Sequence, residues 1–223
     1  DIAKVLDRYV DVIIARVFSH DSLERMAEVA SAPIINALSD REHPCQTLAD
    51  LLTIRTHIGQ LEGVKVAFVG DSNNVARSLA LGCALVGAPF TLVAPEEYQF
   101  TANDTLEIDK IYSDNEYPFS IKMLSDPVAG VSGADVVYTD VWTSMGQESE
   151  SALRRASFQN YQVNDKLMVH AAPEAIFMHD LPAHYGEELA AGMLDHKQSV
   201  VFDQAENRLH AQKAALKLLF ITG

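Results

Sequence analysis

The chain has 223 residues, 48% of them apolar and 22% charged, a composition typical of a globular protein rather than of a disordered chain. It carries 17 basic and 31 acidic residues, a formal net charge of −14, which repels phosphate backbones and argues against non-specific nucleic-acid binding. The chain shows no apolar run of membrane-spanning length and no leader pattern, and its only cysteines are Cys45 and Cys83. We therefore expect a soluble protein of the reducing cytoplasm, without nucleic-acid or membrane partners.

Short runs rich in β-branched residues alternate with helical patterns along the chain. After an opening helical stripe that begins at Ile2, the pattern predicts strands at 11–17, 33–38, 64–69, 89–94, 119–124, 135–140, 175–179 and 199–203. Helices are predicted at 21–30, 44–58, 73–87, 150–158, 186–192 and 205–219. This alternation is typical of parallel sheets built from βαβ units. We predict an α/β fold with two Rossmann-like parallel-sheet domains, the first only partly represented.

Polar side chains follow the predicted strands at the points where those strands end. They are Arg16, His43, Asp71, Asn73, Asn74, Asp140, His179, Asp180, Glu206, Asn207 and Arg208. Ligands of open α/β sheets bind outside the carboxyl ends of the strands, so these positions raise the expectation of a site. Arg16 is notable because it lies inside an apolar strand, and a guanidinium is rarely buried without a partner.

Taken singly, the motifs leave several interpretations open. The string V-G-D-S-N-N-V at 69–75 invites a nucleotide-binding oxidoreductase, but it lacks the G-x-G-x-x-G glycines that let a pyrophosphate approach the backbone. The loop at 140–146 fits a binding loop and a structural turn equally well. His43 before Pro44 fits either an anion-binding helix start or a solvated turn. No His, Cys, Asp or Glu set has a familiar metal-ligand spacing, so no metal is expected.

Taken together, five strings are specific. They are H-P-C-Q (43–46), G-D-S-N-N (70–74), D-V-W-T-S-M-G (140–146), H-D-L-P-A (179–183) and E-N-R (206–208). In their order and spacing, these strings resemble the ornithine carbamoyltransferase family from end to end of the chain. The resemblance implies transfer of a carbamoyl group from carbamoyl phosphate to the δ-amino group of L-ornithine, giving L-citrulline and phosphate. It implies no cofactor and no metal.

The resemblance also implies roles for individual residues. Carbamoyl phosphate would be held by Arg16 and by the H-P-C-Q string, which is His43, Pro44, Cys45 and Gln46, with Arg208 facing the carbamoyl group. Ornithine would be received by Asn74, Asp140, Ser144, Met145, Asp180 and Leu181, the last through its carbonyl beside a cis peptide. Arg16, His43, Asp140 and Asp180 would be the catalytic residues.

The same resemblance implies an organisation into domains and an assembly. Residues 1–45 would be part of a carbamoyl phosphate domain, 46–60 an interdomain helix, 61–204 an ornithine domain, and 205–223 a helix that packs back on the first domain. The family forms homotrimers or higher oligomers of trimers, so we expect the same here.

Two departures from the family pattern limit these expectations. The family usually reads H-C-L-P, whereas Asp180 stands here in place of the cysteine. The family's S-x-R-T-R phosphate loop does not occur in these residues, and we expect it in a segment before Asp1. An inactive homologue that binds an amino acid or a partner enzyme is therefore the alternative function.

Overall fold

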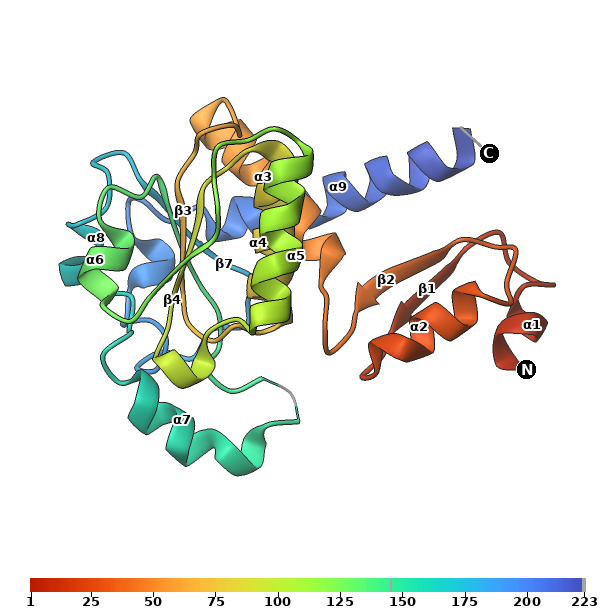
Figure 1. The fold of residues 1–223 in the computed structure, drawn as a ribbon, viewed down its shortest axis with the longest axis horizontal. Helices are drawn as coiled ribbons and strands as arrows, with labels where there is room; N and C mark the ends of the chain where they lie inside the picture. The colour runs from red at the N-terminus through yellow and green to blue at the C-terminus, as the bar shows by residue number, and fades with distance from the viewer. Residues whose placement is uncertain (145, 222–223) are drawn as a thin grey trace.

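The computed structural model describes residues 1–144 and 146–221, which fold around two separate parallel β-sheets (Figure 1). A two-stranded sheet belongs to a small unit at the N-terminus, and a five-stranded sheet forms the larger body. All strand pairs within both sheets are parallel, so the predicted α/β class is confirmed.

The small unit consists of short elements joined to the larger body by one long helix. Its elements are α1 (Ile2–Leu6), β1 (Ile13–Arg16), α2 (His20–Ala27) and β2 (Ile34–Leu38). The helix that follows is α3 (Pro44–Ile58), which begins with proline at its first position and ends at Gly59 in the left-handed conformation. The sequence predicts the same two ends for this helix.

The larger body alternates strands and helices. Its strands are β3 (Val66–Val69), β4 (Phe90–Val93), β5 (Lys122–Leu124), β6 (Val136–Thr139) and β7 (Ile176–His179). Its helices are α4 (Asn74–Val86), α5 (Ala102–Asp114), α6 (Pro127–Val131), α7 (Ser151–Phe158), α8 (Asp165–Met168) and α9 (Val201–Ile221), with 3₁₀ turns η1 (Glu96–Tyr98), η2 (Glu148–Glu150) and η3 (Met193–Asp195). The predicted strands up to 175–179 are therefore present, most of them somewhat shorter than expected.

The order of the strands creates a switch point in the middle of the five-stranded sheet. The order is β5-β4-β3-β6-β7. The chain adds β4 and β5 on one side of β3, and it then crosses back to add β6 and β7 on the other side. Helices α4 and α5 lie on one face and α6 and α8 on the other (Figure 1). Loops that leave β3 and β6 in opposite directions open a crevice between them, where ligands of such sheets bind.

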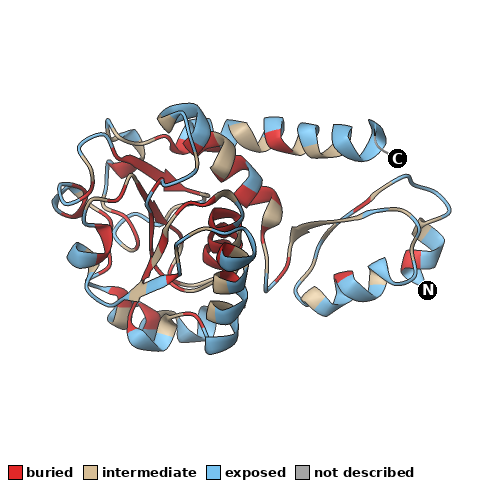
Figure 2. Ribbon diagram, turned by 45° about the horizontal axis from the view of Figure 1, so that its top comes forward, coloured by how far each residue is buried: buried red, intermediate tan, exposed pale blue. Residues whose placement is uncertain are grey.

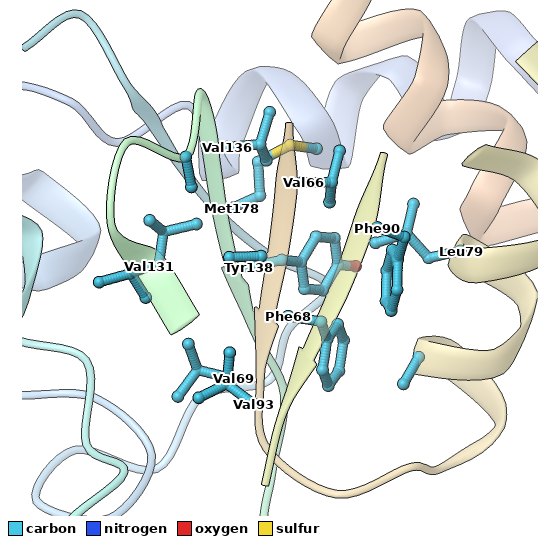
Figure 3. Packing of buried hydrophobic residues seen from close by; sticks show 14 of the residues in the cluster. Val66, Phe68, Val69, Leu79, Phe90, Val93, Val131, Val136, Tyr138 and Met178 are labelled. Atoms are coloured by element: carbon cyan, nitrogen blue, oxygen red, sulfur yellow. The ribbon is translucent and has the colours of Figure 1, made fainter. Parts of the chain in front are cut away.

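The core of the larger body is a continuous apolar layer on both faces of the sheet. Every residue of β3, β6 and β7 is buried, as expected for central strands covered by helices on both faces (Figure 2). The rings of Phe68 and Tyr138 stack with centroids 5.3 Å apart (Figure 3). This packing holds the carboxyl ends of the central strands in fixed positions.

Helix α9 leaves the body after β7 and runs along α3. The two helices are joined by the Asn207 amide, which donates a hydrogen bond to the Thr53 hydroxyl (2.9 Å). Near its start the helix is buried at Val201 and Gln204, whereas apolar side chains at its far end, such as Phe220, are exposed (Figure 2). The helix thus carries residues 204–208 from the core toward the small unit.

Two predictions in the C-terminal part of the chain are wrong. The expected strand at 199–203 makes a single bridge, between Ser199 and Phe177, before α9 begins at Val201. Its β-branched residues are buried by packing of the helix rather than by a ladder. The expected helix at 186–192 is a series of turns, because Gly186 and Gly192 both adopt positive φ and interrupt the helical pattern.

Helix α5 was not predicted from the sequence. Only Ile108 and Tyr112 of this helix are buried, so its apolar stripe is too narrow to stand out from the surrounding polar residues. The capping box formed by Thr101 and Asp104 is the sequence signal that marks its start.

Candidate active site

A cleft of about 1450 Å³ lies where the small unit faces the carboxyl ends of the central strands. Most of the residues singled out from the sequence line it, although they come from several different elements and loops. They are Arg16, His43, Asn74, Asp140, Ser144, Asp180, Leu181 and Arg208. Met145 lies outside the described residues, and Pro44, Cys45 and Gln46 lie behind the cleft wall. The structure therefore brings together residues that the sequence separates by up to 192 positions.

Asp140 lies at the switch point, directly after β6. Its carboxylate accepts a hydrogen bond from Asn73 Nδ2 at 2.7 Å. The other end of the Asn73 amide caps α4, because Oδ1 accepts from the backbone N–H groups of Val75 and Ala76. This cap fixes the amide with its N–H group toward Asp140. The neighbouring Asn74 donates to the Ser39 carbonyl oxygen (2.7 Å) and so links α4 to the small unit.

The opposite wall of the cleft is basic. Burial lowers the pKa of His43 to about 4, and the nearby charges of Arg208 and Arg16 act in the same direction. His43 is therefore a neutral imidazole at neutral pH. Its Nδ1 has no hydrogen-bond partner among the described residues, while its backbone N–H donates to Ser78 Oγ at 2.7 Å. A neutral imidazole can donate or accept a hydrogen bond at the cleft without carrying charge.

Arg16 differs from the sequence interpretation in one respect. We expected a partly buried guanidinium inside an apolar strand, but Arg16 is the last residue of β1 and is exposed to the cleft. The pairing with β2 shifts register between Ala15 and Arg16, which places Arg16 opposite Leu38. Its charge is therefore solvated until a ligand arrives.

The H-P-C-Q string turns inward after its first residue. Pro44 starts α3, and Cys45 is buried with Sγ 3.4 Å from the Asn36 carbonyl oxygen, to which it donates. Gln46 is also buried and reaches the cleft only through Arg208, whose Nη1 donates to Gln46 Oε1 (2.5 Å). The helical geometry of the first turn explains this placement, because successive side chains point in different directions around the axis.

Asp180 follows β7 and faces Asp140 across the crevice. Its side chain is 11% exposed. Burial raises the pKa of Asp180 well above its usual value, and the charge of Asp140 together with a hydrogen bond between the two carboxyl groups raises it further. Burial and the neighbouring carboxylate therefore both favour the neutral form of Asp180. Two carboxyl groups at this end of the cleft suit recognition of an ammonium group.

Leu181 forms the corner of the same loop. It adopts positive φ (59°), and its peptide bond to Pro182 is cis, as the family resemblance implies. Its backbone N–H donates to His179 Nδ1 at 2.9 Å, and His179 Nε2 lies 3.2 Å from the carboxylate of the fully buried Glu188. Both ring nitrogens of His179 therefore make contacts that hold the loop at Leu181 in place.

One group of side chains in the described part of the chain has metal-ligand spacing. Donor atoms of Asp140, His179 and Asp180 lie within 4.8 Å of one another. The bonds that occupy both nitrogens of His179 leave it no free donor atom, so this group does not form a ready metal site. The arrangement suits recognition of a cation by two carboxyl groups better than metal coordination.

Arg154 on α7 is a residue that the sequence analysis did not identify. Its guanidinium donates to Asp71 at 2.7 Å and to the Trp142 carbonyl oxygen at 3.2 Å, and it lies over the Tyr98 ring at 5.0 Å from the centroid. It therefore ties the loop after β6 to the end of β3. In the sequence, an arginine on a short helix resembles a solvated charge, and no local pattern reveals its distant partners.

No helix in the described ranges is long and apolar enough to cross a membrane.

Comparison with known proteins identifies related chains over nearly the whole length. The family model for the aspartate/ornithine carbamoyltransferase carbamoyl-P binding domain matches residues 1–56, and that for the Asp/Orn binding domain matches residues 62–219. The chain is 52% identical over 219 residues to an ornithine carbamoyltransferase of Carboxydothermus hydrogenoformans, and 54% identical over 220 residues to one of Hyperthermus butylicus. These matches cover 98% of this chain in both cases and 70% and 69% of the respective relatives.

Solved structures agree with these matches. The ornithine carbamoyltransferase of Pyrococcus furiosus superposes with a TM-score of 0.91 at 50% identity, covering 97% of this chain and 68% of that one. An acetylornithine transcarbamylase complexed with acetylcitrulline superposes with a TM-score of 0.86 at 28% identity, covering 98% of this chain and 71% of that one. By sequence and by structure, the chain belongs to the aspartate/ornithine carbamoyltransferase family.

Proposed function

We propose that the protein transfers the carbamoyl group of carbamoyl phosphate to the δ-amino group of L-ornithine, giving L-citrulline and phosphate. The observation that carries this proposal is the composition of the cleft. A basic wall of Arg16, His43 and Arg208 suits a dianionic acyl phosphate, and the facing acidic wall of Asp140 and Asp180 suits an ammonium group. Relatives that carry the ornithine carbamoyltransferase name match nearly the whole chain at about half identity.

Carbamoyl phosphate lies, in this proposal, against the basic wall. Arg16 contacts its anionic oxygens and Arg208 faces the carbamoyl group, with Gln46 behind Arg208 and Pro44 and Cys45 shaping the start of α3. His43, being neutral, donates a hydrogen bond to the carbonyl oxygen of the carbamoyl group, on which negative charge develops in the transition state. The free N–H groups at the start of a helix favour an anion at the same place.

Ornithine lies against the acidic wall, with its δ-nitrogen between the two carboxyl groups. Asp140 and Asp180 receive the δ-ammonium group, and the Leu181 carbonyl oxygen accepts a further hydrogen bond from it. Asn74 and Ser144 contact the remainder of the amino acid. Holding both substrates in one cleft converts a bimolecular reaction into an effectively intramolecular one, which needs no cofactor.

The reaction requires two proton losses from the δ-nitrogen. The bound ammonium group must first lose a proton, because only the neutral amine can attack the carbamoyl carbon. The new C–N bond forms as the C–O bond to phosphate breaks, and the second proton passes from the nitrogen to the departing phosphate. Asp140 and Asp180 hold the cation before the first step, and a carboxylate beside the nitrogen opposes the loss of its proton.

The proposal extends to organisation and location. Residues 1–45 belong to the carbamoyl phosphate domain, 46–60 form the interdomain helix and 61–204 form the ornithine domain. From residue 205 onward α9 runs along α3, and its exposed far end is the part that would pack back on the first domain. Both family models support a division close to residue 60. We infer a cytoplasmic enzyme that assembles as a homotrimer or an oligomer of trimers.

A panel of acceptor amines tests the proposed substrate. The protein is incubated with carbamoyl phosphate and, separately, L-ornithine, N-acetyl-L-ornithine or L-aspartate, and the ureido product is quantified. Two carboxyl groups at the end of the cleft predict product from ornithine at a rate at least about a hundredfold above aspartate, which has no δ-ammonium group, since a good charge-assisted contact contributes about 1.5–3 kcal/mol and two are involved. N-acetyl-L-ornithine keeps the δ-ammonium group and tests the contacts to the α-amino end instead. A preference for aspartate or N-acetylornithine would refute the assignment.

A further inference from the structure

A fully buried carboxyl group lies behind the cleft and contacts no part of it. Asp50 is on α3, one turn after Gln46, and its side chain has no exposed surface. Its Oδ1 accepts hydrogen bonds from Gln46 Nε2 at 2.9 Å and from Gln204 Nε2 at 2.7 Å. Its Oδ2 accepts from the Tyr138 hydroxyl at 3.3 Å. Three elements, α3, α9 and β6, therefore meet at this one carboxyl group.

Asp50 dictates which way the two glutamine amides face. An amide offers a donor nitrogen at one end and an acceptor oxygen at the other, whereas Oδ1 of Asp50 only accepts. Both glutamines must therefore turn their nitrogen toward Asp50, which leaves each oxygen pointing away. Gln46 Oε1 accepts from Arg208 Nη1, and Gln204 Oε1 accepts from the His179 backbone N–H at 2.9 Å.

These two oxygens reach opposite walls of the cleft. Arg208 belongs to the basic wall, and His179 precedes Asp180 on the acidic wall. If the Gln46 amide were reversed, its NH₂ group would face the guanidinium of Arg208, donor against donor, and Arg208 would lose this anchor. The contact that anchors Arg208 at Nη1 thus depends on an acceptor at residue 50, two hydrogen bonds away, while Nε and Nη2 face the side-chain amide of Gln212 on the same helix.

We propose that Asp50 is a positioning residue for the reaction, which fixes the Gln46 amide so that its oxygen anchors Arg208 at the carbamoyl phosphate wall. This inference rests on the proposed function, which assigns Arg208 to carbamoyl phosphate. Asp50 touches no substrate and acts only through Gln46.

The energetics of the buried group agree with a directing role. Burial raises the pKa of Asp50 to about 7, although hydrogen bonds from Gln46, Gln204 and Tyr138 act in the opposite direction. An apolar side chain of similar volume would fill the same space without the cost of desolvating a carboxyl group. What the apolar side chain would not supply is an acceptor that orients two amides.

Reversing the polarity of the hydrogen bond between residues 50 and 46 tests this inference. In Gln46→Glu, two carboxyl groups face each other, and at alkaline pH, where Asp50 is ionised, repulsion displaces the introduced side chain from Arg208. We expect the KM for carbamoyl phosphate to rise about tenfold, which is the effect of one lost hydrogen bond to a charged group. Adding Asp50→Asn supplies an N–H group that donates to the new carboxylate at position 46 and returns the other oxygen of that carboxylate to Arg208. The double variant should therefore recover to within about threefold of the unmodified protein.

A matched control separates positioning from support of the fold. Thr53→Val on the same helix removes the hydrogen bond from Asn207, which also joins α3 to α9, but it leaves Gln46 and Arg208 untouched. It should lower the melting temperature without changing the KM for carbamoyl phosphate. Should Gln46→Glu fail to fold, Asp50→Leu compared with Asp50→Asn replaces it. Both remove the charge and only asparagine keeps an acceptor oxygen, so only Asp50→Leu should raise the KM.

The same variants are also compared by thermal unfolding, which needs no activity. Recovery of both the KM and the melting temperature in the double variant supports the inference. A double variant whose KM is no lower than that of Gln46→Glu overturns it, as does an Asp50→Leu variant with unchanged KM. If the unmodified protein forms no citrulline, the proposed function fails. Recovery of the melting temperature alone would then show that residues 50 and 46 are coupled without a role in carbamoyl phosphate binding. That result also contradicts the inference.

Discussion

At the scale of single residues, the acidic wall is where this chain departs most from its family pattern. Asp140 and Asp180 lie close enough to hydrogen-bond, and the pKa of Asp180 is raised by burial and by Asp140. A carboxylate stabilises the ammonium form of ornithine more strongly than a thiol does, and the ammonium form does not react. The wall is therefore suited to binding ornithine as the cation and less suited to releasing its proton.

Asp180→Cys should move the pH optimum of the reaction toward lower pH. The thiol carries less negative charge than the carboxyl group once a cation is bound, so the δ-ammonium group loses its proton more readily. We expect a shift of about one pH unit, which corresponds to about 1.4 kcal/mol of altered interaction with the cation. The measurement is a pH–rate profile of kcat for both proteins, and superimposable profiles would show that Asp180 does not face the reacting nitrogen.

Asp140→Asn should raise the KM for ornithine and lower kcat together. The substitution preserves shape and an acceptor for Asn73, but it removes the charge that meets the δ-ammonium group in a largely buried position. Steady-state kinetics check this, with a loss of about tenfold to a hundredfold in kcat/KM expected for one charge-assisted hydrogen bond. Asp135→Asn, at the opposite end of β6, is the control and should leave the kinetics unchanged. Kinetics of Asp140→Asn equal to those of the control would remove Asp140 from the site.

Arg16→Lys should weaken carbamoyl phosphate binding although it keeps the positive charge. Lysine lacks the planar fork of N–H groups that contacts two oxygens at once, so we expect the KM for carbamoyl phosphate to rise about tenfold or more. Arg25→Lys on α2, also exposed, is the matched control. An Arg16→Lys variant with full affinity would mean that Arg16 supplies only general positive charge.

At the scale of elements, α7 determines the position of the loop that follows β6. Arg154 is 6% exposed and joins this helix to Asp71 and to the Trp142 carbonyl oxygen. Breaking such a pair by removing one partner leaves a buried charge without compensation. The loop that carries Ser144 is thus held from behind, by a helix that does not itself contact ornithine in the proposed complex.

Arg154→Met should raise the KM for ornithine about tenfold and leave the KM for carbamoyl phosphate unchanged. Methionine retains the apolar stem but releases the hydrogen bonds to Asp71 and to the Trp142 carbonyl oxygen, so the loop loses its fixed position relative to β3. The neighbouring Arg155 is exposed and pairs with Glu187, which makes Arg155→Met a control on the same helix. Equal KM changes for both substrates would indicate a general loss of structure instead.

The sequence predicts most elements of this fold because their signals are local. Helix α3 has proline at its start and glycine after its end, and the buried central strands are continuous apolar runs rich in β-branched residues. Helix α5 and the start of α9 were not recognised, for opposite reasons. The first has too few apolar residues to show a period, and the second begins at Val201 within the run Val200-Val201-Phe202, which resembles a strand. In both cases packing of the completed fold determines the structure.

The residues of the site also differ in whether the local sequence predicts their positions. Residues that follow strands could be placed at one edge of the sheet by topology alone, and the structure brings most of them to one cleft. Arg154, Asp50 and Gln204 could not be found this way, because each has a partner 83 to 154 positions away that no local pattern reveals. For the same reason, nothing in the sequence indicates that Gln46 lies behind Arg208 rather than on the cleft surface.

At the scale of the whole molecule, the protein is strongly acidic and yet concentrates Arg16, His43 and Arg208 on one wall of its cleft. The net charge of −14 repels carbamoyl phosphate in general, so the contribution of these few groups to affinity should fall as salt screens their exposed members. The acidic wall follows two strands of the five-stranded sheet, whereas Arg16 ends β1, His43 precedes α3 and Arg208 lies on α9. The separation of the two walls therefore determines whether the carbamoyl carbon and the δ-nitrogen can meet.

The central claim is that this cleft joins the carbamoyl carbon to the δ-nitrogen of ornithine. The most direct measurement is a nuclear magnetic resonance assay that uses ¹³C-labelled carbamoyl phosphate and ornithine labelled with ¹⁵N at the δ-position. We predict a one-bond coupling between the two labels in the citrulline formed, with release of one phosphate for each coupled carbon. Phosphate release without coupled carbon, or label joined to the α-nitrogen, would contradict the account.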